Sequence, residues 1–150
     1  MKNEFYTYRG YQIKQDEKLT VSMEDYLEMI YRICLNEGYT RINQLADNLN
    51  VKASSASKIV QKLAALGLVK YEKYSIIQLT EKGKDKGRYL LERHKTIEEF
   101  LNNIGVKKEM AFRDTELLEH HLSKETYERI SAVNQFLKDN PDILEKIRSI

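Results

Sequence analysis

Carboxylates and a histidine recur at helical spacing in the second half of the chain. In residues 116–120 (ELLEH), Glu116, Glu119 and His120 share one face of a helix, because positions three and four residues apart are neighbours there. His94 lies in the apolar stripe of an earlier expected helix that could pack beside this face. Mixed oxygen and nitrogen ligands suit manganese or ferrous iron better than the thiolate-rich sites of structural zinc. The spacing therefore indicates a candidate divalent-cation site.

Asp25 and Glu28 are further candidate ligands, spaced three residues apart on a helix for which we predict Ser22 as the N-cap. Each candidate also has a structural explanation. Asp25 follows Ser22 by three residues and could complete a capping arrangement, and Glu28 could be a solvated helix residue. His94 could be a core histidine bonded to a carbonyl. His121 points about 100° away from the preceding histidine, so we expect it to be structural, or to support the ligands without binding metal itself. Spacing alone leaves these alternatives open.

Basic residues are concentrated in the middle of the chain. The net charge is +2, but residues 41–95 contain 12 Lys or Arg and 5 Asp or Glu, which gives +7 there and −5 elsewhere. Within this stretch we expect helices over residues 42–49 and 53–66, joined by a short turn at residues 50–52 and followed by a hairpin around residues 74–75. That order is typical of a winged helix-turn-helix, whose helix after the turn enters the major groove of DNA.

The polar face of the expected helix over residues 53–66 carries hydrogen-bonding and cationic side chains. Lysines neutralise phosphates and release condensed counterions, and short polar side chains reach base edges or phosphate oxygens. The alternative is a solvated surface face, but Asp47 is the only acid between residues 41 and 70. We therefore predict contacts with double-stranded DNA from Ser54, Ser55, Ser57, Lys58, Gln61 and Lys62.

The periodicity predicts a mainly α-helical protein. A winged helix-turn-helix lobe of three helices and a two-stranded wing is followed by an all-helical lobe. In the second lobe we expect Thr80 and Ser123 as helix caps, helices over residues 107–120 and 124–139, and a last short helix from Pro141. The expected inward stripe of the helix over 124–139 is Tyr127, Ile130, Val133 and Leu137.

We predict three segments: an N-terminal extension of residues 1–20, a winged-helix domain of residues 21–83 and a helical domain of residues 84–150. The extension contains the aromatic residues Phe5, Tyr6, Tyr8 and Tyr11. It could be a partly disordered tail, or an aromatic arm that packs on the body or on a partner.

Several classes of protein are excluded by what the sequence lacks. Its single cysteine, Cys34, excludes an internal disulfide framework and a cysteine-based zinc site. No apolar run approaches the roughly 18–20 residues of a membrane span, and no secretory signal is recognisable, so we expect a cytoplasmic location and no membrane contact. Phosphate-binding glycine loops and nucleophile motifs are missing. We therefore expect no catalytic residues and no small organic substrate.

Five segments occur in order along the chain: residues 22–28 (SMEDYLE), 54–63 (SSASKIVQKL), 71–74 (YEKY), 92–94 (ERH) and 116–123 (ELLEHHLS). Together, over about residues 21–140, they resemble the metal-dependent repressors of the diphtheria-toxin-repressor family, most closely its branch of manganese transport regulators.

The resemblance implies a homodimer that binds operator DNA when metal is bound and controls genes for metal-ion uptake. It also implies that residues 84–150 mediate dimerisation and bind one or two Mn²⁺ per subunit. Asp25 stands where iron-responsive relatives carry methionine, which implies that Fe²⁺ and other divalent metals are less favoured. The ligands that the resemblance implies are Asp25, Glu28, His94, Glu116, Glu119 and His120.

The sequence departs from the family pattern at a few positions. Ala53 stands where relatives often have proline, Ala56 replaces a larger residue, and the hairpin tip lacks the usual arginine and glycine. Two other functions are compatible with parts of the sequence: a metal-independent winged-helix regulator, and a small two-metal hydrolase. The hydrolase leaves the basic helix-turn-helix unexplained.

Overall fold

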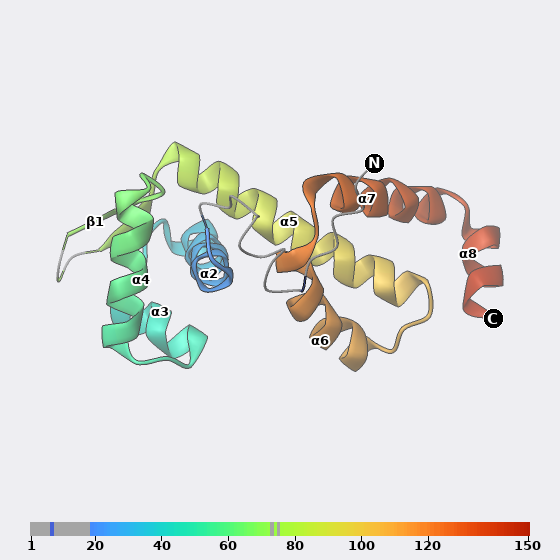
Figure 1. Ribbon diagram of the computed structural model, residues 1–150, viewed down its shortest axis with the longest axis horizontal. Helices are drawn as coiled ribbons and strands as arrows, with labels where there is room; N and C mark the ends of the chain where they lie inside the picture. Colours follow the sequence, from blue (N-terminus) through green and yellow to red (C-terminus); the bar gives the residue numbers. More distant parts are fainter. Residues whose placement is uncertain (1–6, 8–18, 73, 75) are drawn as a thin grey trace.

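The computed structural model describes residue 7 and residues 19–150 except 73 and 75, and the described part consists mainly of helices (Figure 1). The expected extension therefore lies mostly outside the described residues. The elements in chain order are α2 (Val21–Glu37), α3 (Ile42–Leu49), α4 (Ala53–Ala65), β1 (Val69–Tyr71), β2 (Ile77–Leu79), α5 (Glu81–Asn103), α6 (Lys108–Leu118), the 3₁₀ turn η1 (Glu119–His121), α7 (Lys124–Asp139) and α8 (Pro141–Arg148).

The first helix, α2, begins two residues earlier than the sequence suggested. Thr20 has extended backbone, and its hydroxyl accepts a hydrogen bond from the Met23 amide at 3.2 Å. The prediction that Ser22 is the N-cap is wrong, because Ser22 is already inside the helix and exposed. α2 ends at Gly38, whose φ of +78° is a left-handed conformation that glycine adopts without a Cβ clash.

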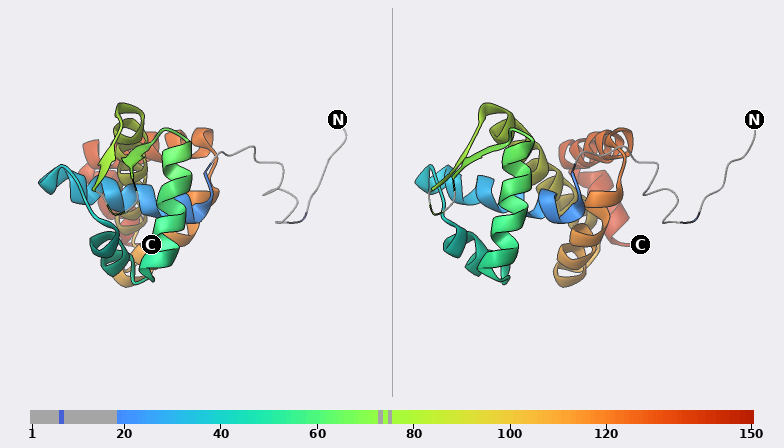
Figure 2. Two further views of the ribbon diagram at one scale, coloured as in Figure 1. Left: turned by 90° about the vertical axis from the view of Figure 1, so that its left-hand side faces the viewer. Right: turned by 60° about the vertical axis from the view of Figure 1, so that its left-hand side comes forward.

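The predicted helix-turn-helix is confirmed. α3 occupies the expected residues, and Asn50 closes it with a left-handed φ of 54°. α4 then runs along the outer side of this lobe (Figure 2), with Val60 and Leu63 packed in a core that also contains Leu27 and Leu45. Because the inner face of α4 is fixed by this core, its polar face is left to solvent.

The wing is a short antiparallel hairpin. β1 pairs with β2 in the register Val69↔Leu79 and Tyr71↔Ile77. Ile77 also forms an isolated bridge with Thr40, and this bridge attaches the wing to the segment between α2 and α3. The described strands are three residues long each, so the helical core carries most of the lobe's packing.

Helix α5 connects the two lobes as one continuous element of 23 residues. As predicted, Thr80 caps it by accepting a hydrogen bond from the Gly83 amide at 3.0 Å. α5 passes close to its neighbours at two glycines: a Cβ at Gly83 would lie 1.8 Å from the Leu68 carbonyl oxygen, and one at Gly87 would lie 2.7 Å from Tyr31 Cβ. Small residues at these positions let α5 pack directly on the DNA-binding lobe.

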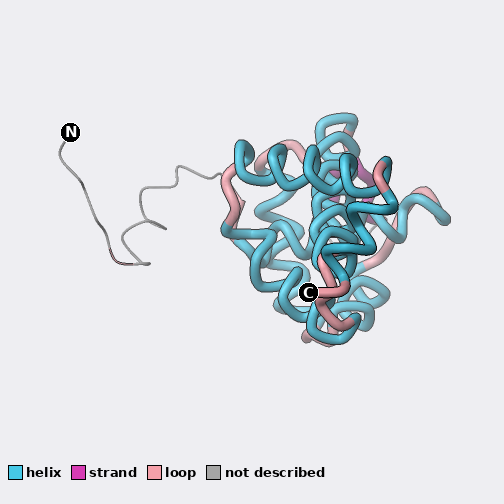
Figure 3. Tube along the Cα trace, turned by 90° about the vertical axis from the view of Figure 1, so that its right-hand side faces the viewer, coloured by secondary structure: helices cyan, strands magenta, loops and turns pink. Residues whose placement is uncertain are grey.

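The second lobe is all-helical, as expected (Figure 3). The expected helix over 107–120 ends at Leu118, and its last turn tightens into η1. The expected stripe of α7 is partly wrong: Leu137 is buried, but Val133 is 47% exposed. Asn134 is buried instead, because it hydrogen-bonds to Asn103 of α5. No helix in the described part of the chain is both long enough and apolar enough to cross a membrane.

Candidate metal centre

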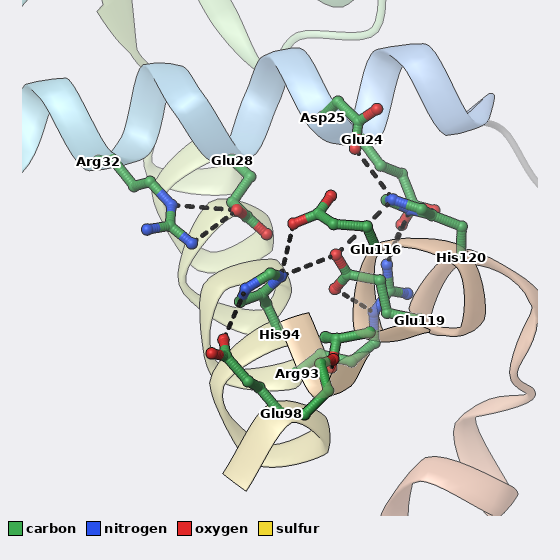
Figure 4. Close-up of polar contacts among 12 residues, drawn as sticks. Glu24, Asp25, Glu28, Arg32, Arg93, His94, Glu98, Glu116, Glu119 and His120 are labelled. Carbon is green, nitrogen blue, oxygen red and sulfur yellow. Dashed lines mark hydrogen bonds and ion pairs between the residues drawn. The ribbon is translucent and has the colours of Figure 1, made fainter. Parts of the chain in front are cut away.

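The six predicted ligands come together where α2, α5, α6 and η1 meet (Figure 4). They form two groups, and within each group one donor atom of every residue lies within 4.8 Å of the others. The Asp25 group joins α2 to the end of α6 and to η1, and the Glu28 group joins α2, α5 and η1. The two groups are Asp25, Glu116 and His120, and Glu28, His94 and Glu119.

The Asp25 group combines an inner histidine with two more accessible carboxylates. His120 Nε2 lies 2.9 Å from Asp25 Oδ1, and the imidazole is almost completely buried. The Asp25 side chain is 43% exposed and that of Glu116 is 44% exposed. Asp25 therefore pairs with a histidine across the two lobes, and the capping role considered for it is wrong.

The Glu28 group is centred on His94 and Glu119, both buried. His94 Nδ1 lies 3.1 Å from Glu119 Oε1 and 3.3 Å from Glu116 Oε1. Glu119 Oε1 is also 3.7 Å from His120 Nε2, so this carboxylate lies between the two groups. Since the partners of His94 are carboxylates, the alternative of a core histidine bonded to a carbonyl is not supported.

Burial and charge shift the pKa values of the centre in a consistent direction. Burial and the nearby Glu119 charge raise the pKa of Glu28, and burial raises that of Glu116. The hydrogen bond to Glu119 raises the pKa of His94 more than burial lowers it. Burial would lower the pKa of His120, but hydrogen bonds to Asp25 and Glu24 outweigh it and raise the pKa to about 10. Without metal, protonated His120 thus balances part of the carboxylate charge.

The donor set fits a hard divalent cation. Four carboxylates and two imidazoles match the oxygen-rich ligation of Mn²⁺ or Fe²⁺. Glu119 Oε2 is buried and has no well-formed hydrogen bond among the described residues, a costly state for a carboxylate oxygen. A cation in this cluster would compensate the charge of Glu119 together with that of the three other carboxylates.

Two family profiles match consecutive parts of the chain. The iron dependent repressor N-terminal DNA binding domain matches residues 18–77, and the iron dependent repressor metal binding and dimerisation domain matches residues 80–148. The chain belongs to the iron dependent repressor family. As a member of that family it is a metal-dependent transcriptional repressor that binds DNA and dimerises.

Known relatives of this repressor are similar over most of its length. The HTH-type transcriptional regulator MntR of Lysinibacillus sphaericus (strain C3-41) is 44% identical over 130 residues, which cover 87% of this chain and 94% of the relative. MntR of Listeria welshimeri is 45% identical over 131 residues, covering 87% and 92%.

Solved structures show the same fold. The metal-dependent transcriptional regulator MtsR superposes with a TM-score of 0.69 at 28% identity, covering 79% of this chain and 55% of that one. A manganese-dependent transcriptional repressor in complex with manganese gives a TM-score of 0.65 at 31% identity, covering 76% and 53%. The repressor thus spans about half the length of these two chains.

The sequence did not single out two charged residues beside the ligands. Glu24, in the first turn of α2, is buried and faces His120. Arg93 is buried between Glu24 and Glu119. The available signals were that Glu24 is four residues before Glu28, on the same helical face, and that Arg93 precedes His94. His121 is exposed and belongs to neither ligand group.

The polar face of α4 is accessible, as a DNA-reading face must be. Five of the six predicted contact residues are exposed and Ser57 is half-buried. Gln61 Nε2 lies 3.5 Å from Ser57 Oγ, a long hydrogen bond that DNA could replace. Lys58 and Lys62 form no salt bridge with other residues in the described part of the chain.

Proposed function

We propose that this repressor responds to manganese: it binds operator DNA as a metal-activated homodimer and controls genes for metal-ion uptake. The observation that carries this proposal is the position of the candidate ligands, which come from α2 of the DNA-binding lobe and from α5, α6 and η1 of the other lobe. The repression of uptake genes follows the resemblance to manganese transport regulators, and relatives named MntR support it.

The six ligand residues link occupancy of the centre to the arrangement of the lobes. Asp25 and Glu28 on α2 face two histidines and two carboxylates of the second lobe, and the four carboxylate charges repel each other. One or two Mn²⁺ held by Asp25, Glu28, His94, Glu116, Glu119 and His120 would supply positive charge that cancels this repulsion. With the repulsion removed, the side chains of α2 and η1 can stay close together.

Helix α2 transmits this constraint to the DNA-reading helix. Leu27 and Ile30 of α2 are in the same core as Val60 and Leu63 of α4. Holding α2 against the second lobe therefore holds α4 at a fixed position relative to the dimer. In a two-fold symmetric dimer, that position sets the distance between the two α4 helices, which must match the half-site spacing of an operator.

The face of α4 supplies the contacts to DNA. Lys58 and Lys62 are placed to neutralise phosphates, and this term is independent of sequence. Ser54, Ser55, Ser57 and Gln61 are near enough to the start and middle of the helix to reach base edges or phosphate oxygens. The predicted domains, residues 21–83 and 84–150, stay predictions, with α5 crossing from one to the other.

The choice of manganese rests on the chemistry of Asp25 and on the relatives. A carboxylate at this position is a hard ligand, which favours Mn²⁺ over softer metals. We also propose that the protein acts in the cytoplasm as a regulator and not as an enzyme. Its relatives are transcriptional regulators, and the hydrolase alternative gives no role to the α4 face.

A DNA-binding titration tests the proposal. The full chain is titrated, with and without Mn²⁺, against DNA from upstream of its own gene and of metal-uptake genes, and fluorescence anisotropy is recorded. We expect Mn²⁺ to increase the affinity, and DNA to tighten Mn²⁺ binding by the same factor. Equal DNA affinity with and without Mn²⁺, together with no Mn²⁺ bound in equilibrium dialysis, would favour the metal-independent regulator.

A further inference from the structure

A buried ion pair that is not among the six ligands joins the two lobes beside the metal centre. Arg93 of α5 and Glu24 of α2 are each only 5% exposed. Arg93 Nη2 lies 3.2 Å from Glu24 Oε2 (Figure 4). Buried charges are costly unless they are paired and well placed, so a pair at this position needs a reason beyond stability.

The second oxygen of Glu24 faces a candidate ligand. Glu24 Oε1 lies 3.3 Å from His120 Nδ1, while Nε2 of the same ring faces Asp25 Oδ1 at 2.9 Å. Arg93 Nη2 is equally near Nδ1, at 3.3 Å. A histidine that binds metal through Nε2 carries its hydrogen on Nδ1, and this hydrogen can be donated to the Glu24 carboxylate but not to the guanidinium, so Glu24 favours this tautomer. Metal-ligating histidines commonly use one nitrogen for the metal and donate from the other to such a carboxylate. Glu24 therefore directs Nε2 of His120 towards the Asp25 group.

Arg93 acts on the other group in a similar way. Its Nε forms an ion pair with Glu119 Oε2 at 3.5 Å, without a well-formed hydrogen bond, and Glu119 Oε1 is directed at His94 Nδ1, 3.1 Å away. One guanidinium thus contacts an oxygen from α2 and an oxygen from η1. It also lies next to His94 on α5, so it is fixed relative to ligands from three elements.

We infer that Glu24 and Arg93 are positioning residues, which orient His120 and Glu119 for metal before any metal binds. This inference rests on the proposed function, because it concerns the same centre. Neither residue needs to bind the metal itself: Glu24 sets the orientation and tautomer of His120, and Arg93 holds both Glu24 and Glu119. The centre then binds metal without first having to rearrange its buried side chains.

Glu24 variants of the full chain test the first part. Mn²⁺ affinity is measured by electron paramagnetic resonance for Glu24→Ala and Glu24→Gln, with Glu92→Gln as control, since Glu92 is an exposed neighbour of Arg93 on α5. We expect Glu24→Ala to weaken Mn²⁺ binding about 10–100-fold. Glu24→Gln should recover part of the loss, because its amide oxygen still accepts from Nδ1–H, and Glu92→Gln should match the wild type.

A measurement on the metal-free protein separates positioning from general damage. In ¹H–¹⁵N spectra of the histidine rings, we expect a slowly exchanging Nδ1–H of His120 in the wild type and in Glu24→Gln, but not in Glu24→Ala. If the Ala variant retains this signal and full Mn²⁺ affinity, the role assigned to Glu24 is wrong. The same holds if Gln and Ala variants lose affinity equally.

Arg93 is tested in a background that avoids leaving a buried charge unpaired. Arg93→Met combined with Glu24→Gln removes both charges, and we expect weaker Mn²⁺ binding than in Glu24→Gln alone, with circular dichroism unchanged. Equal Mn²⁺ affinity of the double and single variants would overturn the role of Arg93. If the wild type itself binds no Mn²⁺, the proposed function fails. If the wild type binds and the variants bind equally well, only this inference fails.

Discussion

The α4 face and the metal centre use charge in opposite ways. On α4, all candidate contact residues come from one helix, most are exposed, and the two lysines are free of salt bridges in the described structure. In the metal centre, the ligands come from four elements, and the innermost are buried and in contact with one another. DNA, a polyanion, can therefore be bound by solvent-exposed side chains that act independently. A single small cation instead requires charged side chains that converge on one point and contact one another.

The largest effect should follow from removing the carboxylate that lies between the two ligand groups. Glu119→Ala takes away a buried ligand and a partner of both His94 and Arg93. We expect Mn²⁺ affinity to fall by at least about 100-fold and Mn²⁺ stimulation of DNA binding to disappear. Glu109→Ala, an exposed acid on α6, is the control. Undiminished stimulation in Glu119→Ala would show that the centre does not act as a unit.

Acid should weaken the centre more than it weakens the α4 face. In the metal-free protein His120 has a pKa of about 10, so it holds a proton near neutral pH, and the raised pKa of His94 favours a proton there too. Metal binding must release them, so affinity rises with pH, by about tenfold per pH unit for each proton released. Mn²⁺ titrations at pH 7 and 8 measure this slope. A pH-independent affinity would mean that neither histidine loses a proton to bind metal.

Salt concentration should affect DNA binding by the α4 face, as pH affects metal binding by the centre. Lys58→Ala with Lys62→Ala removes two phosphate contacts, and we expect roughly tenfold weaker operator binding and a salt slope lowered by about 2. Mn²⁺ affinity should not change. Lys124→Ala removes one positive charge at an exposed position on α7 and is the control. If Lys124→Ala lowers the salt slope by as much per lysine as the double variant does, DNA binding depends on overall charge and not on the α4 face.

The smallest effect on Mn²⁺ affinity should come from Arg32, whose positive charge pairs with the candidate ligand Glu28. Arg32 Nη2 lies 2.9 Å from Glu28 Oε2, in a partly exposed pair. Arg32→Met frees this carboxylate, and since such pairs contribute about 0.5 kcal/mol, we expect about twofold tighter Mn²⁺ binding. Arg88→Met, which removes an exposed pair with Asp85, should have no effect. Weaker binding in Arg32→Met would mean that Arg32 orients Glu28 instead of competing for it.

The same contrast explains what could be predicted from sequence. The helices over residues 42–49 and 53–65 and the caps at Thr80 and Ser123 depend on residues a few positions apart, so local patterns were sufficient. Thr20 and Ser22 are both good caps two residues apart, and local sequence did not distinguish them. The position of Val133 depended on hydrogen bonds between α7 and α5, which no single-helix pattern contains.

The metal centre shows the same limit more clearly. Spacing marked Glu116, Glu119 and His120 as neighbours on one face, but left open whether Asp25 and Glu28 belong with them. The resemblance supplied the grouping, and the structure brings the same residues together. Glu24 and Arg93 are separated by 69 positions in the sequence, and their contact depends on the packing of α2 against α5.

Continuous α5 also has a mechanical consequence. His94 lies 14 residues from the helix cap at Thr80, a distance of about 21 Å along the axis at 1.5 Å per residue. A tilt of about 5° at the centre would therefore displace the wing end of the helix by about 2 Å, well beyond the roughly 0.5 Å tolerance of a precise contact. The close packing at Gly83 and Gly87 would pass that displacement to the DNA-binding lobe with little slack. α5 is thus a lever arm that amplifies sub-ångström changes around the ion into movements on the scale of DNA contacts.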